Sequence, residues 1–183
     1  MNIEQTKNEL LKYIFYYSFQ RGKFKLSSGK ISDFYLDVKQ TTLDPKGSLL
    51  IAKLLVNEII ESAADSIGGL MIGADPIVGS VITLGILQDY YIRGFIVRKE
   101  EKEHGLKRRI EGKIRKKDHV LIVEDVATTG GSTLKAVQAV EELDCKVIKI
   151  VPIVDRNEGS RELFKDYDYD PLIKIEEIFA LEK

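Results

Sequence analysis

VLIVEDVATTGGST, residues 120–133, is the stretch that decides the fold. Its first four residues are apolar, which is typical of a strand buried on both faces of a parallel sheet. Glu124 and Asp125 follow where that strand is expected to leave the sheet, and a Thr/Gly/Ser run then precedes a segment with helical spacing at 131–143. In open α/β sheets, ligands bind at the carboxyl ends of strands. The stretch therefore predicts a parallel strand that ends in a ligand site.

The remainder of the chain alternates short apolar runs with amphipathic segments. We expect helices at 46–63 and 77–92, and strands at 68–73, 94–98, 146–155 and, as an edge strand, 172–181. This alternation predicts an α/β fold with a mainly parallel central sheet flanked by helices. We expect one domain over residues 1–183, in which about residues 1–40 and the last 20 or so form a small hood.

The run TTGGST at 128–133 has the composition of a phosphate-binding loop. Glycines let the backbone approach an anion closely, and the amides at a helix start bind phosphate. A simpler explanation is that the loop is an ordinary helix N-cap and that the two acids are solvated. The run lacks the lysine of a Walker A loop and the spacing of a dinucleotide fingerprint. Acids followed by a phosphate loop suit a sugar phosphate, with carboxylates on the ribose hydroxyls and amides on the 5′-phosphate.

The stretch VLIVEDVATTGGST closely resembles the phosphoribosyl pyrophosphate (PRPP) motif of the type I phosphoribosyltransferases. The resemblance implies the fold of that family, with Glu124 and Asp125 at the ribose 2′ and 3′ hydroxyls and Asp125 among the catalytic residues. It also assigns a set of loop residues to PRPP, mainly around its 5′-phosphate: Thr128, Thr129, Gly130, Gly131, Ser132 and Thr133.

A charged segment, RKEEKEHG at 98–105, resembles the mobile catalytic loop of the orotate phosphoribosyltransferases. On composition alone such a segment is a solvated loop. The resemblance instead implies that Arg98, Lys99, Lys102 and His104 bind PRPP. Lys102 and His104 would then stabilise or protonate the departing pyrophosphate. In the family this loop, about 98–117 here, reaches the neighbouring subunit's site, which implies a homodimer with shared active sites.

Two further segments bear on the base. FKLSSGKISDFYLDVK at 24–39 resembles the family segment that covers the nucleobase, which places Phe34 and Tyr35 over orotate. The lysine that some members carry before the Ser-Gly pair is absent here. Taken alone, the segment is an ordinary half-buried strand entered through a Ser-Gly turn.

VPIVDRNEG at 151–159 places Arg156 just after a buried strand, and a guanidinium is a natural bidentate partner for the carboxylate of orotate. The resemblance adds a hydroxyl contact from Thr128. The alternative is a surface pair between Asp155 and Arg156, which contributes little to stability.

GADPIVGS at 73–80 resembles the loop that holds pyrophosphate through backbone amides, here those of 74–77. Some relatives carry a lysine in this loop, and this sequence has none. A plain strand–helix turn explains the segment equally well.

The charge distribution supports a local anion site. The net charge is −1, but residues 98–117 hold ten lysines or arginines and four glutamates, so a +6 segment sits in a −7 remainder. A nucleic-acid-binding protein would be more basic over its whole surface. Within the +6 segment, 107–117 has no expected role beyond a solvated loop arm.

Composition excludes other classes. One cysteine and two histidines exclude a disulfide framework and a Cys/His zinc site. No apolar run has membrane length and the first residues do not resemble a signal peptide, so we expect a cytoplasmic protein without a membrane partner.

Together these features predict Mg²⁺-dependent transfer of the 5-phosphoribosyl group from PRPP to orotate, giving orotidine 5′-monophosphate and pyrophosphate in pyrimidine synthesis. We expect PRPP itself to hold most of the Mg²⁺ coordination, with Glu124 and Asp125 nearby and no direct protein ligand. A purine or uracil phosphoribosyltransferase is the nearest alternative, and the 98–105 loop and Arg156 argue against it. A PRPP-sensing regulator would need a nucleic-acid-binding face, and a fused decarboxylase needs more than 183 residues.

Overall fold

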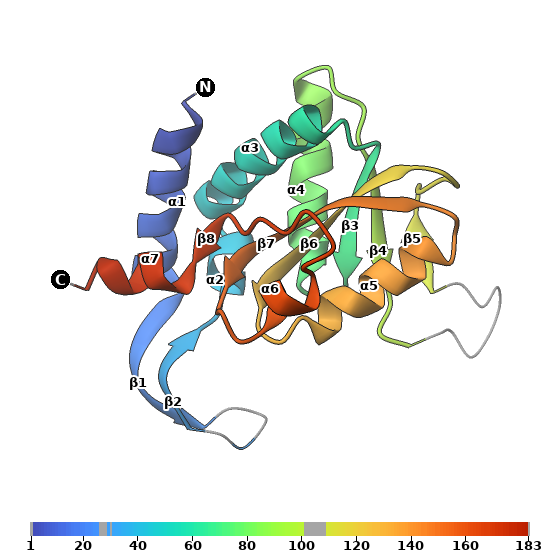
Figure 1. The fold of residues 1–183 in the computed structure, drawn as a ribbon. Coiled ribbons are helices and arrows are strands. Elements are labelled where there is room, and N and C mark those ends of the chain that lie inside the picture. The colour runs from blue at the N-terminus through green and yellow to red at the C-terminus, as the bar shows by residue number, and fades with distance from the viewer. Residues whose placement is uncertain (1, 26–28, 30, 101–108, 183) are drawn as a thin grey trace.

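A six-stranded sheet forms the centre of the computed structural model, which describes residues 2–25, 29, 31–100 and 109–182 (Figure 1). Its strand order is β5-β4-β3-β6-β7-β8. The strands are β3 (Ser66–Leu70), β4 (Arg93–Val97), β5 (Ile110–Gly112), β6 (His119–Ala127), β7 (Lys146–Asp155) and β8 (Ile173–Lys174). All neighbours pair in parallel except β5, which runs antiparallel to β4. The predicted α/β fold with a mainly parallel sheet is confirmed.

Seven helices and a hairpin complete the described part of the chain. The helices are α1 (Ile3–Tyr17), α2 (Lys39–Thr42), α3 (Pro45–Ser62), α4 (Ala74–Leu87), α5 (Gly131–Glu141), α6 (Ser160–Leu163) and α7 (Ile175–Ala180). Strands β1 (Phe19–Lys25) and β2 (Ile31–Leu36) pair as an antiparallel hairpin that projects from the main sheet (Figure 1).

Two hydrophobic cores lie on the two faces of the sheet, and β6 contributes to both. Leu121 and Val123 pack in one core with α1, α3 and α4, while Val120 and Ile122 pack in the other with α5. All four side chains are 0–1% exposed. Because successive strand residues point to opposite faces, an unbroken apolar run is what a two-sided sheet requires. Burial of each such side chain contributes about 1.5–3 kcal/mol, so β6 is held firmly where its acids begin.

The helix expected at 77–92 begins earlier, at Ala74, and ends at Leu87. Pro76 explains the earlier start, because proline lacks an amide hydrogen and fits best in the first turn of a helix. Strand β3 correspondingly stops at Leu70, short of the predicted end at residue 73.

The expectation of an edge strand at 172–181 is wrong. Only Ile173 and Lys174 form a strand, and α7 follows at once. Ile175 and Ile178 are both buried three residues apart, which is helical spacing. The Glu177 carboxylate accepts a 2.7 Å hydrogen bond from the backbone amide of Lys174, which caps the helix start.

The expectation of a plain loop arm at 107–117 is wrong for its described part. Ile110–Gly112 form β5 and pair with Phe95, Ile96 and Val97 of β4. Ile110 and Ile114 pack on the core beneath α5, and burial of these two side chains favours the return of this short basic segment along β4. Residues 101–108, with Lys102 and His104, lie outside the described residues.

Candidate active site

The carboxyl end of β6 extends beyond its neighbour β3. Pairing with β3 ends at Ile122, whereas pairing with β7 continues through Ala127. The chain leaves β3 toward β4 on one side and leaves β6 toward β7 on the other, so the strand order reverses between β3 and β6. Such a switch point opens a crevice at the strand ends. Glu124 and Asp125 lie in this crevice, still within the strand.

Glu124 is not a solvated acid. Its side chain is partly buried and accepts a hydrogen bond from the Thr133 hydroxyl. Burial, reinforced by the neighbouring Asp125, raises the pKa of Glu124 to about 7. The crevice therefore holds one carboxyl that titrates near neutrality.

The loop after β6 is open to an anion. Helix α5 has Gly130 at its N-cap, in a left-handed conformation with φ 83°, and this residue has no side chain to cap the helix amides. A Cβ at Gly130 would lie 2.8 Å from the Phe164 ring, so glycine is required for space as well as conformation. The helix start borders a cavity of about 310 Å³, whose lining residues are Glu124, Val126, Thr128, Thr129, Gly130, Gly131, Ser132 and Lys135. Because glycine has no capping side chain, the helix start lacks an ordinary side-chain N-cap, and its amides fit the predicted phosphate site.

A second cavity, about 300 Å³, adjoins the first at Glu124 and Ser132. Asp125, Lys39, Lys99 and the turn at 70–73 also line it. The Gly73 backbone lies against Asp125, since a Cβ there would come within 2.3 Å of Asp125 Oδ1. The β3–α4 turn and the β6 acids thus form one site.

Two lysines of these cavities were missed by sequence reasoning. Lys135 lies on the first turns of α5, and its place one turn after the glycine pair is a signal that was available. Lys39 comes from a segment 86 residues away from its partner Asp125, so no local spacing predicts it.

Two predicted cations of the 98–105 loop, Arg98 and Lys99, lie in the described residues, and they occupy different positions. Lys99 lines the second cavity. Arg98 instead pairs with Glu111 across the β4–β5 hairpin, with 3.1 Å between Nε and Oε1. The structure does not bring Arg98 to the other predicted residues.

Arg156 lies beside the phosphate loop because its backbone amide donates to the Ala127 carbonyl at 2.9 Å. Its side chain is 9% exposed and its guanidinium carbon lies 4.6 Å from the centre of the Phe34 ring. One terminal nitrogen contacts Glu158 Oε1 at 2.8 Å, and buried Nε has no hydrogen-bond partner among the described residues. A buried donor without a partner is costly unless a ligand satisfies it.

The alternative of a surface Asp155–Arg156 pair is wrong. Asp155 is 4% exposed and accepts hydrogen bonds from the Asn157 amide and the Ser160 hydroxyl, at 2.8 and 3.1 Å. These bonds hold the end of β7 and leave Arg156 for another partner.

Phe34 and Tyr35 lie on opposite faces of the hairpin, because they are consecutive strand residues. Phe34 faces Arg156, whereas Tyr35 packs on Phe24 with 5.5 Å between ring centres. Only Phe34 is brought to the other site residues.

The described residues contain no cluster of three or more His, Cys, Asp or Glu side chains that could hold a metal. Glu124 and Asp125 supply carboxylate oxygens, which are the donors Mg²⁺ prefers, but they are too few for a protein-made cage. This donor set fits an ion held largely by its substrate.

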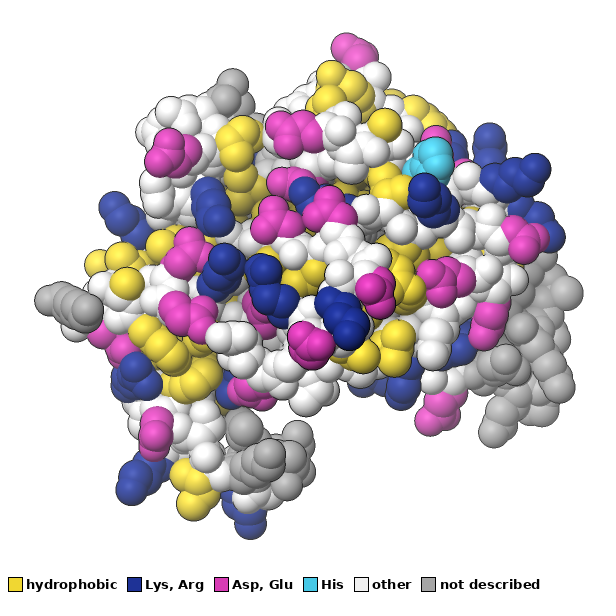
Figure 2. Space-filling model, in the orientation of Figure 1, with side chains coloured by type: hydrophobic (Ala, Val, Ile, Leu, Met, Phe, Trp, Pro, Cys, Tyr) yellow, Lys and Arg dark blue, Asp and Glu magenta, His cyan; other side chains and the backbone are white. Residues whose placement is uncertain are grey.

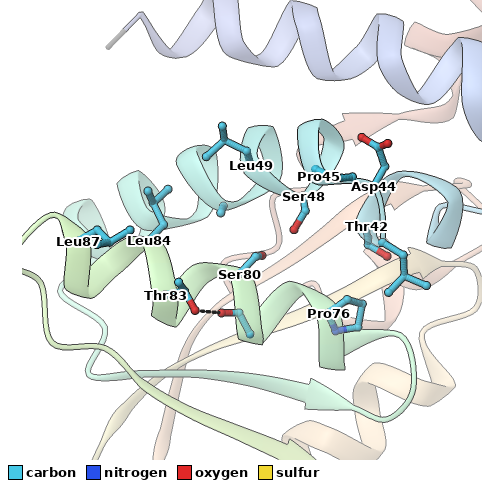
Figure 3. A pocket seen from close by; sticks show the side chains of 13 residues that line it. Thr42, Asp44, Pro45, Ser48, Leu49, Pro76, Ser80, Thr83, Leu84 and Leu87 are labelled. Carbon is cyan, nitrogen blue, oxygen red and sulfur yellow. Dashed lines mark hydrogen bonds between the residues drawn. The ribbon is translucent and has the colours of Figure 1, made fainter.

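The other described surfaces hold fewer groups that could bind or react with a substrate. A larger cavity of about 540 Å³ lies between α3 and α4, and its walls are mainly apolar (Figure 3). Lysines and arginines are interspersed with acids on the face shown in Figure 2. No helix in the described ranges is long and apolar enough to cross a bilayer.

Comparisons with known proteins agree with this geometry. The phosphoribosyl transferase domain family matches residues 46–181. Orotate phosphoribosyltransferase of Aquifex aeolicus is 48% identical over 139 residues, 76% of this chain and 76% of that protein. That of Bradyrhizobium diazoefficiens is 41% identical over 168 residues, 90% of each chain.

A solved structure agrees as well. The Mycobacterium tuberculosis orotate phosphoribosyltransferase in complex with PRPP has a TM-score of 0.79 and 29% identity, covering 95% of this chain and 99% of that one. With this similarity in sequence and in structure, the chain belongs to the orotate phosphoribosyltransferases of the phosphoribosyltransferase family.

Proposed function

We propose that the chain transfers the 5-phosphoribosyl group from PRPP to orotate, giving orotidine 5′-monophosphate and pyrophosphate in the synthesis of UMP. One observation carries this function. A nearly buried guanidinium, Arg156, lies beside a phosphate loop and two ribose-type acids at one sheet edge. A base with a carboxylate supplies the partner that this guanidinium needs.

Each part of the site has a role in this reaction. The α5 amides and the 128–133 loop bind the 5′-phosphate, and Glu124 and Asp125 hold the ribose hydroxyls. A ring nitrogen of orotate bonds to the anomeric carbon and loses its N–H proton, while the carbon–oxygen bond to pyrophosphate breaks and the departing pyrophosphate can take up a proton. Positive charge builds on the ribose in the transition state, as in glycoside chemistry.

The base side is formed by Arg156, Thr128 and Phe34. Arg156 binds the orotate carboxylate, and Phe34 packs over the guanidinium and lines the base site. Tyr35 remains a predicted contact, because it lies on the other face of the hairpin in this structure.

Charge on the departing pyrophosphate must be neutralised. Lys99 lines the second cavity, and we propose Lys102 and His104 for the same task on the strength of the family resemblance. Arg98 remains a predicted contact, because it pairs with Glu111 in this structure. Mg²⁺ bound beside Glu124 and Asp125, mainly through PRPP oxygens, would offset negative charge on the leaving group.

An assay with a panel of bases tests the function. We expect pyrophosphate release with PRPP, Mg²⁺ and orotate, and background rates with uracil, hypoxanthine and adenine. Loss of orotate absorbance and phosphate-coupled detection of pyrophosphate measure the two sides of the reaction. Turnover of uracil or hypoxanthine without turnover of orotate would contradict the substrate assignment.

We propose a homodimer with shared sites, in which the α3–α4 groove seats the second copy. Leu43 and Leu87 line the groove and are 71% and 76% exposed, an apolar surface that a partner would cover. Helix α4 begins next to Gly73, whose backbone lies against Asp125. A copy seated on this groove therefore lies close to the active site.

Mixing two inactive variants tests the shared site. If the loop acts in the neighbouring subunit, equal amounts of Lys102→Ala and Asp125→Asn chains are expected to recover about a quarter of wild-type activity. The reason is that half of the C2 dimers are mixed and each mixed dimer has one intact site. Activity after subunit exchange is the measurement.

A matched pair controls for nonspecific rescue. Asp125→Asn mixed with Arg156→Ala, assayed at orotate far below the raised KM of the Arg156 variant, is expected to show no gain over the unmixed variants, because both residues belong to one chain's site and every dimer lacks an intact one. Equal activity in the two mixtures, or none in the first despite proven exchange, would contradict a loop acting across the dimer.

We retain two broader proposals. Residues 1–183 act as one domain with about 1–40 as the hood, and the cytoplasm is the proposed compartment for this step of nucleotide synthesis.

A further inference from the structure

Lys39 links the hairpin to the active site. It is the first residue of α2, three residues after β2 ends at Leu36. Its ammonium lies 3.1 Å from Asp125 Oδ2 and 3.3 Å from Asp37 Oδ1. In this arrangement a cation from the N-terminal segment covers a carboxylate that the reaction needs for ribose.

The cavity at Lys39 places a second cation and a loop turn beside the acids Glu124 and Asp125. Lys39 shares this cavity with Lys99 and with the β3–α4 turn at 70–73, whose loop carries no lysine anywhere in 73–80. The side chain is 46% exposed, so it has room to move. Partial burial opposes its charge, but Asp125 and Asp37 outweigh burial and keep the pKa of Lys39 above its ordinary value.

The Lys39–Asp125 pair is suited to exchange. A half-exposed single ion pair contributes little stability, so breaking it is easy. Pyrophosphate offers several charged oxygens to the same ammonium. Ribose hydroxyls offer Asp125 hydrogen-bond donors in return. Binding of PRPP would thus replace one ion pair with two better-matched contacts.

We propose that Lys39 binds the pyrophosphate group of PRPP, supplying the cation that the 73–80 loop lacks, and that its move frees Asp125 for the ribose hydroxyls. The inference rests on the proposed function, since PRPP is the donor there. The proposal gives residues 34–39 contacts with both substrates, because Phe34 on the preceding strand faces Arg156, the proposed ligand of orotate.

Replacement of Lys39 tests the proposal with three ligands. Lys39→Met is expected to raise the PRPP KM and the inhibition constant of pyrophosphate by about tenfold or more, the usual range for losing a charge-assisted hydrogen bond. The affinity for ribose 5-phosphate, which lacks pyrophosphate, is expected to stay unchanged or to increase. Lys39→Arg keeps the charge and is expected to recover most of the loss.

Lys46→Met is the matched control. Lys46 forms an exposed lysine–carboxylate pair with Glu9 at 2.7 Å, on α3 and away from the site cavities, and its loss is expected to leave all three ligands unaffected. Thermal unfolding of each variant checks that the fold is retained.

Two outcomes would overturn the proposal. Unchanged PRPP and pyrophosphate constants in Lys39→Met would show that Lys39 does not bind pyrophosphate. Equal weakening of PRPP and ribose 5-phosphate would show that Lys39 acts only through Asp125. Either result leaves the reaction intact if the wild-type chain still turns over orotate, so this test and that of the proposed function fail separately.

Discussion

Arg156→Ala is expected to raise the KM for orotate by about 30-fold or more while the KM for PRPP changes by less than about threefold, because truncating one partner of a buried charge pair costs about 2–5 kcal/mol. The guanidinium is 9% exposed, so the orotate carboxylate would meet it with little competition from water. Steady-state kinetics with each substrate varied in turn measure the split.

The specificity of the loss separates binding from folding. Arg161→Ala removes an exposed arginine five residues further along the chain, in α6, and is expected to change neither KM. The ratio of kcat/KM for orotate to that for uracil is expected to fall in Arg156→Ala, because uracil has no carboxylate and does not depend on the guanidinium. An equal rise of both KM values would instead indicate that Arg156 is structural, through its contacts with Glu158 and Phe34.

Local patterns predicted the centre of the fold well. The apolar run at 120–123 required a strand buried on both faces, and its side chains do alternate between the two cores. The acids and the phosphate loop follow in the same stretch, so their positions depend on a single strand–loop–helix unit. Arg156 was predicted because β7 is the next parallel strand, and parallel strands end at the same edge.

Contacts between distant segments could not be predicted in the same way. Lys39 reaches Asp125 across 86 residues, and that contact depends on how the hairpin enters α2. Arg98 has a partner in Glu111 only because β5 turns back along β4, which the basic composition of 107–117 concealed. At the C-terminus, alternating apolar residues matched a strand by period 2, but burial of Ile175 and Ile178 together selected a helix.

Glu124→Gln is expected to stabilise the substrate-free protein above neutral pH. The folded pKa of about 7 lies above the ordinary value of 4.5. Between these values the folded chain holds a proton that the unfolded chain has released, so stability is lost as pH rises. Over about 2.5 units this amounts to at most about 3 kcal/mol by pH 8. Glutamine resembles the protonated acid and still accepts from Thr133, so it avoids the loss.

The measurement is thermal and denaturant unfolding of both proteins from pH 5 to pH 9. We expect nearly equal stability at pH 5 and a Tm for Glu124→Gln that is higher by about 6–12 °C at pH 8. Glu142→Gln, an exposed glutamate just after α5, is the control and is expected to follow the wild type. Parallel curves for Glu124→Gln and the wild type would contradict the raised pKa.

The same substitution is expected to weaken PRPP use, by about 10- to 100-fold in kcat/KM, because a charged acceptor on the ribose hydroxyls becomes neutral. For the wild type, kcat/KM for PRPP is expected to rise with pH through about 7 as Glu124 ionises. The ratio of wild type to variant removes the ionisation of PRPP itself, since that affects both proteins equally. A ratio that grows from pH 6 to pH 8 would show that the ionised form of Glu124 is the form that uses PRPP. A flat ratio would contradict this. Glu124 would then destabilise the free protein and bind PRPP through the same charge. Stability at this sheet edge would be lower than the fold allows, because the charge is needed when PRPP is bound.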